Sequence, residues 1–200
     1  LNISAISDPV ALRMLFEANL GRAIVEDEVS GFEEILQRVD SHTLILELIA
    51  KQISNSHITL SNAAALAAKH GFSSIASEKV DYERDNDSKR DTVGNIIDAL
   101  FEASSLSDEK KTLMKVASLL GDNGININQL QQILHLASKD DLNELNSDGW
   151  LMLSGDTISM HRVIQESVHR WDWLPVYLEA AEQFLCYFYV ELRLESTKNN

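Results

Sequence analysis

Residues 150–171 read WLMLSGDTISMHRVIQESVHRW, and no other part of the chain says as much about its architecture. Two short segments, 150–153 (WLML) and 157–160 (TISM), flank the tripeptide Ser-Gly-Asp at 154–156 and are expected to be strands. Two such segments around a three-residue loop that contains glycine predict a β-hairpin. Apolar side chains then recur at helical spacing, which predicts a helix that begins directly after the hairpin.

The segments before the hairpin predict a winged-helix domain over residues 105–172. Ser107 caps a helix that ends at Gly121, because glycine there suits a left-handed terminator. The segment 124–127 is extended, and two further short helices follow, the second of which ends at Gly149. The order helix, short strand, helix, helix, hairpin is typical of the winged helix.

Residues 1–104 predict a helical domain, and the chain as a whole is expected to be mainly α because it has only two Pro and eight Gly. Asp8 can cap the first helix and Pro9 suits its first turn. The helix over 43–53 is apolar on too many sides for one stripe, so we expect it at the centre of the bundle. The charged segment 73–91 has almost no helical period and is expected to form a mobile loop.

Residues 173–200 predict a C-terminal connecting helix, which would lead towards a possible array of helical repeats. Its segment 184–190 is apolar all round, and such a helix is either buried or made to meet a partner. We therefore expect a homodimer through Tyr187, Phe188 and Val190.

Composition narrows the possible partners. The 200 residues carry 17 Lys plus Arg against 31 Asp plus Glu, a net charge of −14, which offers no general footprint for nucleic acid or for an anionic membrane. Cys186 has no cysteine with which to form an internal disulfide, which is typical of a cytoplasmic protein. The sequence lacks the pattern of a signal peptide and has no apolar run of about 18 residues that would span a membrane.

Three segments carry a resemblance to a known family: 3–16 (ISAISDPVALRMLF), 41–51 (SHTLILELIAK) and 158–165 (ISMHRVIQ). They resemble the STAND class of signalling NTPases, which includes the NB-ARC or AP-ATPase-like proteins. In that class a helical (ARC1-like) domain and a winged-helix domain follow a P-loop nucleotide-binding core. The resemblance covers about residues 1–171 and implies that this chain corresponds to the two modules that follow the core.

The resemblance also implies two nucleotide-contacting positions. Thr43 and Leu44 match the motif that packs beside the adenine, and Met160 and His161 match the motif whose histidine reaches the β-phosphate of ADP. Thr43 replaces the usual proline of the first motif, and Arg162 replaces the aspartate of the second. In this view His161 fastens the winged helix over ADP in the resting state and releases it on nucleotide exchange.

The chain lacks any Gly-x-x-x-x-Gly-Lys-Ser/Thr segment and any apolar strand that ends in paired acidic residues. We therefore expect no enzyme activity, no cofactor and no metal site in this chain. ATP or ADP is expected in the full-length parent, bound by an upstream core of the same polypeptide, which is the implied partner of these modules. The function expected is that of a regulatory, nucleotide-controlled switch that mediates assembly in the cytoplasm.

The purely structural interpretation of His161 is that it caps or packs at the junction between hairpin and helix. The sequence leaves open both this interpretation and the contact with ADP. Lys115, Arg162 and Arg170 are expected to be ordinary solvated charges. His42, just before a buried helix, is expected to be a cap or a surface residue.

The alternative function is a winged-helix DNA-binding transcription regulator. The helix that would enter the major groove, in residues 138–145, has one cation and three anions, and residues 107–171 carry nine acids and six bases. Because phosphate contacts supply most non-specific affinity, we do not expect this domain to bind nucleic acid.

Overall fold

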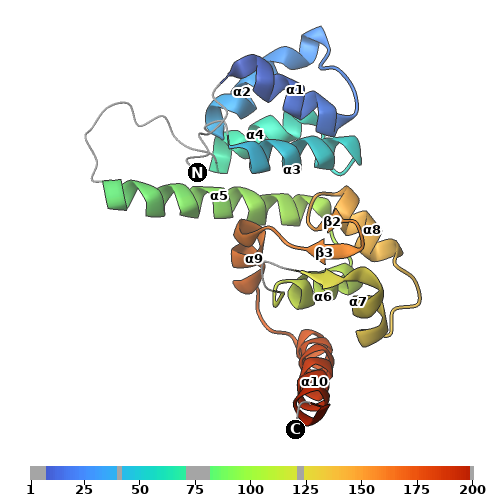
Figure 1. The fold of residues 1–200 in the computed structure, drawn as a ribbon. Coiled ribbons are helices and arrows are strands. Elements are labelled where there is room, and N and C mark those ends of the chain that lie inside the picture. The colour runs from blue at the N-terminus through green and yellow to red at the C-terminus, as the bar shows by residue number, and fades with distance from the viewer. Residues whose placement is uncertain (1–7, 40–41, 71–81, 121–123, 199–200) are drawn as a thin grey trace. The chain divides into compact units, whose positions relative to one another are not determined.

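The computed structural model describes residues 8–39, 42–70, 82–120 and 124–198, with side chains in these ranges except at 82–92 and 191–198. The chain divides into two compact units, Leu1–Leu106 and Ser107–Asn200. The described residues are mainly helical and include a small antiparallel sheet of three strands (Figure 1). The boundary expected after residue 104 lies beside this division, and residues 173–200 group with the second unit.

The first unit is entirely helical in its described part. Its elements are α1 (Pro9–Leu20), the short 3-10 helix η1 (Glu26–Glu28), α2 (Val29–Arg38), α3 (Thr43–Ser54), α4 (Leu60–His70) and α5 (Tyr82–Ser104). The helix α3 packs against α1, α4 and α5, while α2 packs on α4. Its side chains at Ile45, Leu46, Leu48 and Ile49 are buried, which confirms the predicted central position.

Local signals set both ends of α1. The Asp8 carboxylate accepts a hydrogen bond of 3.1 Å from the Val10 amide, and Pro9 occupies the first turn, where no amide donor is needed. Gly21 ends the helix with a φ of 75°, and its amide donates to the Glu17 carbonyl at 3.0 Å. The predicted start of this helix is confirmed.

The charged segment 73–91 was expected to be a loop, and this expectation is wrong for residues 82–91, which form the first half of α5. Residues 73–81 lie outside the described residues. The C-terminal half of α5 is apolar and packed, with buried side chains at Val93, Ile96, Ile97 and Leu100. The helix extends from this half towards its N-terminus. Because nucleation is the costly step, a packed half extends into a charged segment at little further cost, whether or not that segment has an apolar stripe.

The second unit combines helices with the sheet. Its elements are α6 (Asp108–Ala117), β1 (Ile125–Asn126), α7 (Ile127–Ile133), α8 (Asp140–Ser147), β2 (Met152–Ser154), β3 (Thr157–Ser159), α9 (Arg162–His169) and α10 (Pro175–Lys198). The strand β3 lies between β1 and β2, with Ile158 opposite both Ile125 and Leu153 (Figure 1). The predicted hairpin is confirmed, but its loop has two residues, Gly155 and Asp156, because Ser154 pairs with Thr157 in the sheet. The strand β2 also begins two residues later than predicted, at Met152.

Candidate functional site

His161 stands between β3 and α9 as the N-cap of that helix. Its Nδ1 accepts a hydrogen bond of 3.3 Å from the Val163 amide, and its carbonyl accepts from the Gln165 amide at 3.0 Å. Because Nδ1 accepts, this hydrogen bond assigns the proton of a neutral ring to Nε2. The side chain is half-buried, whereas the preceding Met160 is buried. The capping role left open by the sequence is therefore present.

The helix α9 is tied by its side chains to the C-terminal end of α6 and the residues after it. Gln165 donates from Nε2 to the Leu120 carbonyl at 2.9 Å, and Nε2 of His169 lies 2.8 Å from the Ser118 carbonyl oxygen. Arg162 points to solvent and pairs with Glu166 one turn later, at 3.3 Å. The helix α9, whose N-cap is His161, is thus held to residues 118–120 by polar contacts at two successive turns.

Lys115 was expected at the surface, and this expectation is wrong: its exposed fraction is 0%. It lies on α6, where its neighbours Met114, Val116 and Ala117 are also buried. Its Nζ donates to the Trp171 carbonyl at 2.6 Å and lies 4.5 Å from the centre of the Trp173 ring. Burial lowers the pKa of Lys115, against which the Asp172 carboxylate acts in the opposite direction.

Thr43 and Leu44 form the first turn of α3, and both side chains are half-buried. His42 is the N-cap residue of this helix, as the sequence allowed, but its side chain makes no capping hydrogen bond. Thr43 and Leu44 belong to the first unit and His161 to the second. Thr43 and Leu44 therefore lie at the start of α3, and His161 lies at the start of α9.

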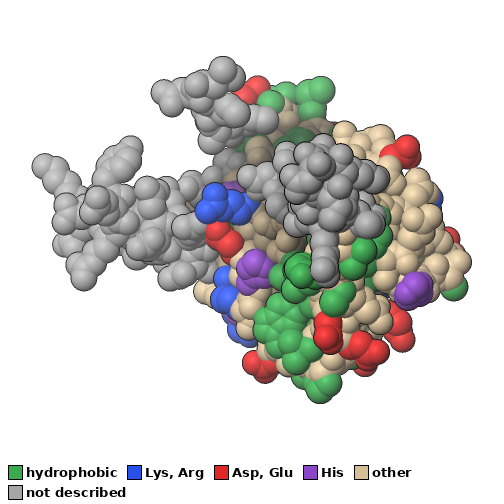
Figure 2. Space-filling view, turned by 60° about the horizontal axis from the view of Figure 1, so that its bottom comes forward, with side chains coloured by type: hydrophobic (Ala, Val, Ile, Leu, Met, Phe, Trp, Pro, Cys, Tyr) green, Lys and Arg blue, Asp and Glu red, His purple; other side chains and the backbone are tan. Residues whose placement is uncertain are grey.

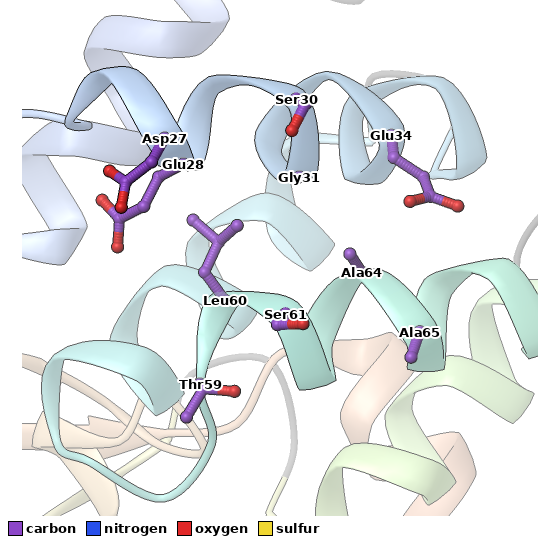
Figure 3. Close-up of a pocket in the computed structure, with 10 residues that line it drawn as sticks. All are labelled: Asp27, Glu28, Ser30, Gly31, Glu34, Thr59, Leu60, Ser61, Ala64 and Ala65. Carbon is purple, nitrogen blue, oxygen red and sulfur yellow. The ribbon is translucent and has the colours of Figure 1, made fainter.

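A groove in the first unit was not among the residues singled out from the sequence (Figure 3). It has a volume of about 720 Å³ and lies between η1 and α2 on one side and the start of α4 on the other. Its lining carries three carboxylates (Asp27, Glu28 and Glu34) and three hydroxyls (Ser30, Thr59 and Ser61). The other lining residues are apolar or small: Gly31, Leu60, Ala64 and Ala65. Such a lining accepts hydrogen bonds from cationic groups.

One of these carboxylates is already engaged. Glu28 receives two hydrogen bonds of 2.6 Å from the Arg22 guanidinium, and these hold the pKa of Glu28 below its ordinary value. A Cβ added to Gly31 would come within 2.4 Å of the Leu60 side chain, so α2 and α4 approach closely. The small residues of the groove are thus also packing residues, which is why the sequence did not single them out.

The residues expected at a dimer interface have different environments on α10. The Tyr187 hydroxyl accepts from Gln129 Nε2 at 3.3 Å, and the Phe188 ring packs on Phe184 with ring centres 5.0 Å apart. Both side chains are half-buried, whereas Val190 is 53% exposed. Other apolar residues of α10 are exposed as well: Val176, Leu178, Leu185 and Tyr189. Figure 2 shows hydrophobic side chains gathered on the face of the molecule that it views.

Comparisons with protein-family models, with curated proteins and with solved structures gave no match to this chain. Within the described residues, no group of three or more His, Cys, Asp or Glu side chains is arranged to hold a metal ion. No helix in that part of the chain has the length and hydropathy needed to span a membrane.

Proposed function

We propose that this chain is the non-catalytic, regulatory portion of a nucleotide-controlled signalling ATPase of the STAND class. Its second unit would be the winged-helix module, and its first unit the helical module. The element order α6, β1, α7, α8, β2, β3, α9 supports this assignment, as does the pairing of β1 with the hairpin. Both modules would close over ADP or ATP held by an upstream core of the same polypeptide.

The observation that carries this proposal is the position of His161. His161 is a half-buried imidazole at the N-cap of α9, where its Nδ1 accepts from the Val163 amide. The first amides of α9 add a partial positive charge at the same place. These features suit a phosphate oxygen, and they give His161 one role in holding the helix and another in holding the nucleotide.

The environment of Thr43 and Leu44 is compatible with the adenine-packing role. Both are half-buried at the start of α3, so a flat base could cover the surface that they still expose. Thr43 in place of proline supplies a hydroxyl beside the apolar Leu44. We propose that this turn contacts the base while His161 contacts the phosphate.

The charge of α8 counts against the alternative of DNA binding. Asp140, Asp141 and Glu144 are exposed on this helix, and Lys139 immediately before it hydrogen-bonds Asn128. Lys110 pairs with Glu144. A helix with this surface would be repelled by phosphates in a major groove, so we propose no role in nucleic-acid recognition.

Exchange of His161 tests the nucleotide role in the full-length parent protein. His161→Ala is expected to release ADP about tenfold faster, the effect of losing one charge-assisted hydrogen bond. His161→Asp separates the two roles, since aspartate is a better N-cap but repels phosphate. We expect His161→Asp to keep the stability of the second unit and to release ADP faster than His161→Ala, as measured by the dissociation of a fluorescent ADP analogue.

Retention of ADP by His161→Asp at the wild-type rate would contradict the proposal, because it would leave capping as the only role of the side chain. His161→Asn, which keeps both a capping oxygen and a donor amide, is the matched control and is expected to lie closest to wild type.

We also propose that the partner of α10 is a second copy of this chain. The exposed side chains Leu178, Leu185 and Tyr189 recur at intervals of seven and four residues, which places them on one stripe of the helix. A two-fold axis would cover the same stripe on both copies. This stripe, rather than the half-buried Tyr187 and Phe188, is the surface that a homodimer would use.

Leu185→Glu is expected to shift the chain from dimer to monomer in sedimentation velocity, since it places a charge within the proposed interface. Gln183→Glu adds the same charge at an exposed position on another side of the helix and is expected to leave the dimer intact. A wild-type chain that sediments as a monomer at all concentrations, or equal behaviour of the two variants, would contradict the proposed interface.

A further inference from the structure

The connection between α9 and α10, residues 170–174, is held by a residue far away in sequence. Its own backbone bonds are local: the Arg170 and Trp171 amides donate to the Ser167 and Val168 carbonyls, each at 3.1 Å. Lys115, from α6, reaches it with the 2.6 Å hydrogen bond to the Trp171 carbonyl and places its ammonium over the Trp173 ring. Asp172, Trp173 and Leu174 are otherwise exposed.

Because Lys115 is buried, the free energy of its contact with the connection is a balance of favourable and unfavourable contributions. A charge-assisted hydrogen bond and a cation–π contact favour the closed connection. The desolvation of a fully buried ammonium opposes it, and this cost is recovered as soon as water reaches Nζ. Because large favourable and unfavourable free-energy contributions oppose each other in the Lys115 contact, this contact can break while the rest of the second unit stays folded.

We propose that the α9–α10 connection is a latched hinge and that Lys115 is its latch. When the latch is closed, the Trp171 carbonyl and the Trp173 ring are held against α6, and α10 starts in a fixed direction. When it opens, the connection over 170–174 is released, while the buried side chains of Tyr177 and Phe184 on α10 are left as the pivot. This inference rests on the geometry of the second unit alone and does not depend on the proposed function.

Lys115→Met tests the latch, because methionine fills the space of the lysine stem but removes both the charge and the donor. Backbone hydrogen exchange of the Arg170 and Trp171 amides, which are both hydrogen-bonded, is expected to become about tenfold faster, with the amides of α7 and β3 within about twofold of wild type. Lys111→Met is the matched control on the same helix. Its partly exposed ammonium has only a 3.9 Å contact with Asp108, so no change in exchange is expected.

A second variant protects the test against loss of folding in Lys115→Met. Trp173→Leu removes the aromatic face but leaves an apolar side chain at a position that is 39% exposed, so folding should persist. Exchange of the Arg170 and Trp171 amides in this variant is expected to rise about threefold, because only one of the two contacts is lost. Exchange of the Arg170 and Trp171 amides that stays at the wild-type rate in the folded variants, or that rises equally throughout the second unit, would overturn the latch.

Discussion

Replacing Gly124 by alanine is expected to destabilise the second unit by about 3 kcal/mol, because it combines backbone strain with a collision. Gly124 has a φ of +65°, a conformation that side chains rarely adopt. A Cβ on this residue would lie 2.3 Å from the Ile158 carbonyl oxygen and 3.0 Å from the Ser159 Cβ. Backbone cannot move aside as a flexible side chain can, so β1 would separate from β3.

Gly155→Ala is the matched control for this change. Gly155, in the loop of the hairpin, also has a positive φ of +59°, but nothing lies within 4 Å of a Cβ added there. We expect it to cost about 1 kcal/mol, the strain alone. All three tryptophans, Trp150, Trp171 and Trp173, belong to the second unit, so urea unfolding followed by tryptophan fluorescence measures this unit specifically. Equal losses in both variants would show that β1 tolerates the collision.

Phe16→Ala is expected to destabilise the first unit by about 4 kcal/mol, through the lost burial of the ring and the cavity that it leaves. Phe16 has an exposed fraction of 0%, and its ring centre lies 5.0 Å from that of Phe32. The change therefore affects the contact of α1 with the rest of the bundle.

Met14→Ala, two residues earlier on the same helix, is the control. Met14 is 66% exposed, and we expect a change of no more than about 0.5 kcal/mol. Hydrogen exchange of the amides of α3 measures the effect, since this unit lacks tryptophan. Similar exchange in Phe16→Ala and in wild type would contradict the packing described for α1 and α3.

Features governed by local chemistry could be predicted from the sequence. The cap and proline at Asp8 and Pro9 fix the start of α1 through neighbouring backbone amides, and the turn that contains Gly155 joins adjacent strands. The burial of α3 was equally predictable, since a helix that is apolar on several sides has to be covered on several sides. In each case the signal and the structure involve the same few residues.

Features governed by distant contacts could not be predicted in this way. Lys115 is buried because an acceptor 56 positions later, the Trp171 carbonyl, comes to meet it, and no spacing in the sequence encodes that contact. The charged half of α5 is helical because its apolar half is packed. The groove beside Gly31 arises from the approach of α2 to α4, which no local pattern in the sequence indicates.

The central position of β3 has a mechanical consequence for anything that binds at the end of the hairpin. A ligand that pulls on His161 applies a force to β3. This strand is paired along both edges, with β1 at Ile125 and with β2 at Leu153. The three strands therefore transmit such a force together. Because β1 ends at Asn126, the force passes directly to Ile127, the first residue of α7.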